Sequence, residues 1–196
     1  VPGGTEPLYP YLAMVGVAFL GDSAVGLRLT GAVIGILTLP VVYGCARAIF
    51  NSTRVGLLSA FFGAISLWHI FFNRYGERVS LLVLFTALIF WFFWRAQQTQ
   101  SRRDYLLVGL FTALALYTYP GSRVLPIALI LLTGYVALDD RKNARRSIKG
   151  LLLALTVAAI IVFPLGIYFV FHPDQFAAHS LEVSIFVPHG SVTTDV

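Results

Sequence analysis

The sequence has little charge and almost no sulfur. Only 12% of its 196 residues are Asp, Glu, Lys or Arg, whereas 58% are hydrophobic, and the mean hydropathy is +0.81. So little polar surface cannot cover a soluble globule of this size. The single cysteine, Cys45, excludes a disulfide within the chain. The sequence also lacks a Gly-rich phosphate loop, a nucleophile elbow and a paired-cysteine motif.

Nucleic-acid binding is not expected either, although the pI is about 9.6. The basic residues lie at the ends of apolar segments and form no continuous stripe. We therefore expect no nucleic-acid partner, and we expect membrane lipids to surround the chain.

Six apolar stretches predict an all-α, polytopic membrane helical bundle, because about 20 apolar residues cross a bilayer as a helix. They run over 24–49, 55–72, 78–94, 105–119, 123–138 and 151–171. A shorter apolar stretch with tyrosines at its start, residues 7–20, predicts a helix that lies along the membrane interface. Residues 172–196 are expected to form an outer loop. The whole chain, 1–196, then belongs to one membrane domain.

Every second connection between these stretches is basic, which predicts the orientation of the chain. Ten of the 14 Lys and Arg residues lie there: Arg47, Arg54, Arg95, Arg102, Arg103, Arg141, Lys142, Arg145, Arg146 and Lys149. Basic loops stay in the cytoplasm, so both ends of this multi-pass chain are expected outside the cell membrane. We also expect the chain to be part of a larger membrane protein, since it begins without a Met or a signal peptide.

Four arginines fall on the outer side instead: Arg28, Arg74, Arg78 and Arg123. If a helix begins near Arg74, the four-residue spacing places Arg74 and Arg78 on one helical face, where they suit two phosphate oxygens. Glu77 follows Arg74 by three residues, so a solvated loop salt bridge is the alternative. Both readings stay open.

A second outer turn, over residues 117–123, places Tyr119 beside Arg123. Tyr and Arg together suit a sugar or phosphate group, although an interfacial Tyr often serves only as an anchor. His69 is expected to be a hydrogen-bonded packing residue. A divalent metal remains conceivable in the outer tail, without tight ligand spacing, and its candidate ligands are His172, Asp174, His179, Glu182 and His189.

An ordered set of short motifs resembles a known family. The motifs are Glu6–Leu12, Gly21–Ser23, Leu27–Ala32, Leu37–Thr38, Ala46–Phe50, Asn73–Arg78, Leu116–Pro126, His172–Phe176 and Val183–Phe186. They are similar to polyprenyl-phosphate-dependent glycosyltransferases with the C-type membrane fold. The branch is related to dolichyl-phosphate-mannose protein mannosyltransferases and bacterial aminoarabinose transferases.

The resemblance implies a hexosyltransferase that moves a sugar from a lipid-linked donor to a glycan, lipid or protein acceptor outside the membrane. Such enzymes use an Asp just after the first span as base, which is expected upstream of Val1, with Glu6 as a neighbour of that base. The residues 1–196 alone are then expected to be inactive. The donor phosphate is assigned to Arg74, Arg78, Arg123 and Tyr119. His179 departs from the family pattern, where an Arg is expected.

Two other function classes are compatible with the outer arginines. A transporter or flippase of a lipid-linked or anionic solute needs the same charges, but no inverted repeat is visible. A structural membrane subunit is the third possibility. An Asp shortly after a preceding span distinguishes the transferase from both.

Overall fold

The computed structural model describes residues 8–20 and 24–171, and within these ranges it contains helices and no β-strand. The elements are α1 (Leu8–Leu20), α2 (Ala24–Phe50), α3 (Thr53–Ile65), α4 (Leu67–Tyr75), α5 (Arg78–Thr99), α6 (Arg102–Leu116), η1 (Pro120–Arg123), α7 (Val124–Asp139) and α8 (Ala144–Phe171). The prediction of an all-α membrane bundle is confirmed. The predicted outer loop lies outside the described residues.

Short polar residues and left-handed residues determine where the helices end. The Ser52 side chain accepts a hydrogen bond from the Val55 amide and caps α3. Ser66 ends α3 and also caps α4, because its side chain accepts from the His69 amide at 3.5 Å. Gly76, with a φ of 71°, ends α4 in the left-handed region, which glycine adopts without strain. α4 and α5 are therefore separate helices.

In the described part of the chain, four helical segments are long and apolar enough to cross a membrane: Arg28–Phe50, Arg78–Thr99, Pro120–Asp139 and Ala144–Tyr168. The predicted span 55–72 is a pair of helices, α3 and α4, bent by 56° at Ser66. The predicted span 105–119 corresponds to α6, whose 15 residues rise about 22 Å. A hydrocarbon core is about 30 Å thick. The six-span topology and the interfacial position of α1 remain predictions.

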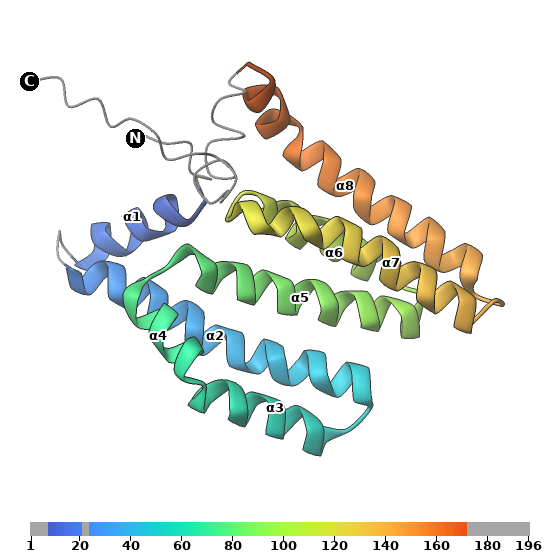
Figure 1. The fold of residues 1–196 in the computed structure, drawn as a ribbon, viewed down its shortest axis with the longest axis horizontal. Helices are drawn as coiled ribbons and strands as arrows, with labels where there is room; N and C mark the ends of the chain where they lie inside the picture. Colours follow the sequence, from blue (N-terminus) through green and yellow to red (C-terminus); the bar gives the residue numbers. More distant parts are fainter. Residues whose placement is uncertain (1–7, 21–23, 172–196) are drawn as a thin grey trace, which may run out of the picture. The chain divides into compact units, whose positions relative to one another are not determined.

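The chain divides into two compact units, Glu6–Val162 and Val1–Thr5 with Phe163–Val196. In the second unit, the described part is the end of α8. In the first unit, α5 packs between α2 and α6, and α1, α3 and α4 pack against α2 (Figure 1).

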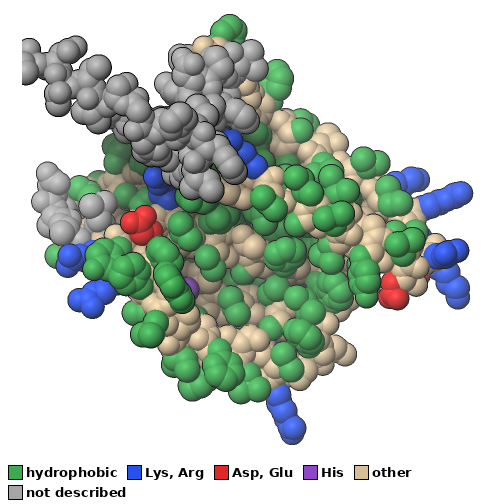
Figure 2. All heavy atoms as spheres, in the orientation of Figure 1, with side chains coloured by type: hydrophobic (Ala, Val, Ile, Leu, Met, Phe, Trp, Pro, Cys, Tyr) green, Lys and Arg blue, Asp and Glu red, His purple; other side chains and the backbone are tan. Residues whose placement is uncertain are grey.

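The core of the first unit forms where α5 meets its neighbours. Ile89 and Phe93 of α5 are buried with Val108 of α6, and Leu129 of α7 and Ala154 of α8 join the same cluster. Large hydrophobic side chains also cover the outside, as the view in Figure 2 shows. These exposed hydrophobic side chains suit a lipid environment, in which apolar surface does not need to be buried.

Hydrogen bonds bring the basic connections to one end of the helices. Gln98 Nε2 near the end of α5 donates to the Ala48 carbonyl of α2 at 2.8 Å. Ser147 Oγ at the start of α8 donates to Gln97 Oε1 at 2.6 Å. Because each of these residues adjoins a basic connection, we call this the basic end. Figure 2 shows Lys and Arg side chains gathered there.

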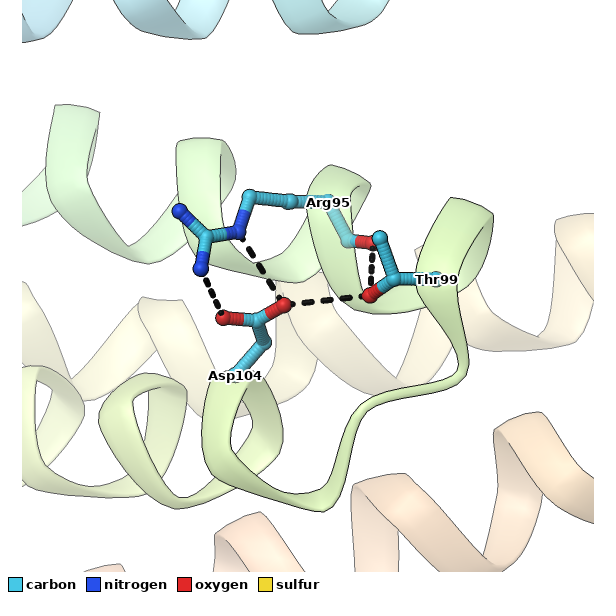
Figure 3. A network of polar contacts seen from close by, with 3 residues as sticks. All are labelled: Arg95, Thr99 and Asp104. Atoms are coloured by element: carbon cyan, nitrogen blue, oxygen red, sulfur yellow. Dashed lines mark hydrogen bonds and ion pairs between the residues drawn. The ribbon is translucent and has the colours of Figure 1, made fainter.

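An ion pair between a buried carboxylate and a half-exposed arginine holds the turn between α5 and α6 at this end (Figure 3). Arg95 Nε donates to Asp104 Oδ2 at 3.1 Å, and a second guanidinium nitrogen lies 3.0 Å from Oδ1. Thr99 Oγ1 lies 3.1 Å from Oδ2 and 2.9 Å from the Arg95 carbonyl. The Asp104 side chain is 2% exposed, so its charge depends on these partners.

Candidate functional site

The opposite end of the helices contains a close crossing of α2 and α4. A Cβ at Gly31 would overlap the Asn73 carbonyl, and one at Gly35 would lie 2.6 Å from Asn73 Cγ. The small residues at this four-residue spacing on α2 therefore let α4 approach, as in other membrane helix pairs. The sequence signal was present as Gly31-x-x-x-Gly35, although sequence reasoning did not use it.

His69 connects the two helices through both ring nitrogens. Its Nε2 lies 3.2 Å from the Gly35 carbonyl, which only accepts, so Nε2 carries the proton. Its Nδ1 then accepts from Asn73 Nδ2 at 3.2 Å, and the same amide donates to the His69 carbonyl at 2.6 Å. The neutral ring satisfies both contacts. His69 is thus the hydrogen-bonded packing residue that the sequence predicted.

An apolar groove of about 520 Å³ runs along this crossing. Its wall on α2 extends from Val25 to Leu39, and Ala64 of α3 with Ile70 of α4 contribute further apolar surface. Fourteen residues along a helix correspond to about 21 Å. The groove is therefore long enough for an extended hydrocarbon chain.

Two arginines lie at the end of this groove that is farther from the basic end. Arg28 of α2 and Arg74 of α4 both line it, and both side chains are exposed. Within the described residues, neither guanidinium has an acidic or hydrogen-bonding partner. Asn73 Oδ1 is buried and has no hydrogen-bond partner among the described residues, but it is an acceptor and would not bind an anion. The groove thus combines a long apolar wall with the donors of two arginines, an arrangement suited to a lipid that carries an anionic group.

The structure separates the four predicted phosphate residues. Arg74 lies in the last turn of α4, whereas Arg78 is the first residue of α5, so the expected common helical face does not exist. Gly76 is the reason, because its left-handed conformation ends one helix before the next begins. Tyr119 precedes η1, and Arg123 is the last residue of η1. Arg74 lines the groove and another hollow along α4, and neither of these includes Arg78, Tyr119 or Arg123. Their joint role in binding phosphate remains a prediction.

The alternative ion pair of Arg74 with Glu77 is not observed among the described residues. Instead, the charge of Glu77 affects the hydroxyl of Tyr9 in α1. Burial and, secondarily, the negative charge of Glu77 raise the pKa of the Tyr9 hydroxyl above its ordinary value. A hydrogen bond of 3.2 Å from the Leu8 amide to the Tyr117 carbonyl also joins α1 to the outer turn. α1 therefore lies against the end of the bundle that bears the groove.

The predicted catalytic and metal-binding residues cannot be placed. Glu6 and the acidic and histidine residues of 172–196 lie outside the described residues. Within 8–20 and 24–171, no group of three His, Cys, Asp or Glu side chains is arranged to hold a metal ion. Among the described residues, Glu77 is the one carboxylate at the end of the bundle that bears the groove.

Comparison with known proteins identifies the family. Residues 2–168 match the profile of the dolichyl-phosphate-mannose-protein mannosyltransferase family. Searches of the curated proteins and of the solved structures give no significant match. The match covers most of the chain, including the crossing of α2 with α4 and the outer turn. The chain therefore belongs to the dolichyl-phosphate-mannose-protein mannosyltransferase family and is a multi-pass membrane glycosyltransferase.

Proposed function

We propose that this protein transfers a hexose from a polyprenyl-phosphate carrier to a glycan, lipid or protein acceptor on the extracytoplasmic side of the cell membrane. The observation that carries the proposal is the groove between α2 and α4, with its apolar wall and its two arginines, which have no partner among the described residues. A polyprenyl phosphate has the matching chemistry, since a long apolar chain ends in an anion.

The groove favours a lipid donor over a soluble nucleotide sugar. Its lining includes aliphatic side chains from Val25 to Leu39, and a nucleotide base and ribose would leave their polar groups unpaired against such a wall. A polyprenyl chain instead contacts this wall along its length. The phosphate then meets the guanidinium groups of Arg28 and Arg74, which bind phosphate in a fork geometry.

The same arginines are suited to the chemical step. As the bond between the sugar and the phosphate breaks, negative charge accumulates on the leaving phosphate. Fixed cations beside an apolar boundary stabilise that charge more strongly than water does. In this proposal Arg74 and Arg28 bind the phosphate, and Arg78, Arg123 and Tyr119 approach the sugar-phosphate from the neighbouring turns.

The basic end supports the orientation. Because basic loops are retained in the cytoplasm, the groove arginines at the opposite end face the extracytoplasmic side. We assign the acceptor base to no described residue, and we propose that residues 1–196 alone do not turn over. Incubation of the purified chain with polyprenyl-phosphate sugars and an acceptor extract, followed by mass spectrometry, tests this point. Sugar transfer would direct attention to Glu77 and Glu6.

Binding of the carrier tests the groove directly. The chain in detergent is titrated with a polyprenyl phosphate and with the corresponding polyprenol, and native mass spectrometry measures occupancy. Arg28→Ala and Arg74→Ala are each expected to weaken phosphate binding about 10- to 100-fold, because a charge-assisted contact contributes about 1.5–3 kcal/mol. Polyprenol binding should stay nearly constant.

Arg54→Ala is the matched control, since Arg54 is an exposed arginine at the basic end of α3. It should leave the affinity for polyprenyl phosphate unchanged. Equal affinities of all three variants and the parent would exclude the groove as the carrier site. A substitution in the apolar wall, Ile36→Trp, should weaken both lipids, because Ile36 lines the groove.

A further inference from the structure

A further hollow, of about 480 Å³, lies at the basic end, far along the helices from the groove. It is formed by the end of α5, the start of α6 and the start of α8. Arg102 of α6 and Arg146 and Lys149 of α8 line it, together with Tyr105. Unlike the groove between α2 and α4, it has a strongly cationic lining.

The three cations have no acidic partner. Within the described residues, Arg102, Arg146 and Lys149 are exposed and form no ion pair. The nearest buried carboxylate in sequence, Asp104, already binds Arg95 and Thr99 (Figure 3). Of the two acidic residues that precede α8, Asp140 accepts two hydrogen bonds from Asn143, one of them at 2.8 Å.

Two of these cations lie in the first turn of a helix. Arg102 and Arg103 occupy the first turn of α6, and Arg145 and Arg146 occupy the first turn of α8. A helix N-terminus carries a partial positive charge, which disfavours an arginine there, although Asp104 in the same turn of α6 offsets part of this charge. Ser101 also makes no capping hydrogen bond through its side chain. An anion between the two N-termini would relieve both conflicts.

Tyr105 contributes the aromatic part of the lining. It is 3% exposed, and its hydroxyl lies next to the Ser147 side chain. The Ser147 hydroxyl donates its proton to Gln97 Oε1, so its oxygen can accept a hydrogen bond from Tyr105. Gly150 fixes the position of the ring, because a Cβ there would overlap it. The exposed cations, rather than this buried hydroxyl, are therefore the groups that can reach a ligand.

We propose that this hollow binds the phosphate headgroup of an anionic phospholipid from the leaflet on the basic side. The three cations would bind the phosphate oxygens. Leu153 lines the hollow one helical turn beyond Lys149, toward the apolar part of α8, and would contact the start of an acyl chain. This direction from charge to apolar surface favours a lipid over a soluble phosphate.

Lipid exchange on the intact chain tests the proposal. The chain in detergent is titrated with phosphatidylglycerol, with phosphatidylcholine and with glycerol phosphate, and native mass spectrometry measures occupancy. We expect a preference of at least tenfold for phosphatidylglycerol over both other probes. Equal affinity for glycerol phosphate would assign the hollow to a soluble phosphate and overturn the lipid proposal.

Two sets of variants separate this site from general attraction to basic loops. Neutralising the lining in Arg102→Gln/Arg146→Gln/Lys149→Gln should abolish the preference. The control Arg141→Gln/Lys142→Gln removes exposed cations from the same connection that do not line the hollow, and it should keep the preference. Equal losses in the two sets, or no loss in the first, would overturn the proposal. Circular dichroism verifies that each variant is helical.

Discussion

The Asn73 side chain occupies the space that a side chain on Gly35 would need. An ideal Cβ on Gly35 lies 2.6 Å from Asn73 Cγ, nearer than non-bonded atoms approach. The carboxamide is also held in place, because it donates to the His69 carbonyl at 2.6 Å. The crossing of α2 and α4 thus depends on the absence of a methyl group.

Gly35→Ala should therefore destabilise the chain although alanine is the better helix former. The new methyl group must displace Asn73, and overpacking of this kind costs about 1–3 kcal/mol. Thermal unfolding in detergent measures the effect. Gly134→Ala in α7 is the control, since a Cβ there has no neighbour within 4 Å. It should leave stability unchanged or raise it by up to about 1 kcal/mol.

Arg74→Ala should lower the rate of sugar transfer, measured in a membrane preparation in which the parent protein is active. Loss of one donor to a leaving group typically costs about 10²–10³ in turnover. Arg78→Ala should lower turnover by about tenfold or more, whereas Arg78→Lys should retain part of the activity because it keeps the charge but loses the fork. Parental rates for both alanine variants would exclude a role of these arginines at the phosphate.

Asp104→Asn should destabilise the turn between α5 and α6. The variant removes the negative charge from a buried carboxylate that faces Arg95 and Thr99. Because Arg95 is half exposed, water partly compensates its guanidinium, and we expect a loss of about 1–2 kcal/mol rather than the larger cost of a fully buried pair. Asp139→Asn, an exposed carboxylate at the end of α7, should change the unfolding free energy by less than about 0.5 kcal/mol.

Cysteine labelling tests the orientation of the chain. Single cysteines at Tyr75 and Lys142 in a Cys45→Ala background place one exposed thiol at each end. An impermeant thiol reagent applied to intact cells should label Tyr75→Cys and leave Lys142→Cys unlabelled, as the positive-inside rule requires. The reverse pattern, or labelling of both sites before lysis, would contradict the proposed topology.

Hydropathy alone predicted several helix positions closely. The predicted stretch 24–49 is α2 (Ala24–Phe50), and 123–138 is α7 (Val124–Asp139). The start of α8 was placed late, at residue 151 instead of Ala144. Lys and Arg continue a helix readily, so the helix extends beyond the apolar part that hydropathy detects.

The candidate site was harder to predict because it depends on contacts between distant residues. Arg28 and Arg74 are both visible in the sequence as outer arginines, but only the packing of α4 on α2 places them along one groove. The pairing of Arg74 with Arg78 relied on a continuous helix, and the left-handed Gly76 interrupts it. Glycine can adopt many backbone conformations, so the amino-acid sequence alone does not reveal which one Gly76 adopts in the fold.

The bend at Ser66 determines how deep a charge lies in the bilayer. If α3 follows the membrane normal, the 56° bend makes α4, with its nine residues, advance only about 7 Å toward the surface instead of about 13 Å. Arg74 then lies about 6 Å nearer the bilayer centre than a straight helix would carry it. The bilayer would become thinner around Arg74, and the phosphate of a lipid bound there would lie deeper than the phosphates of neighbouring lipids.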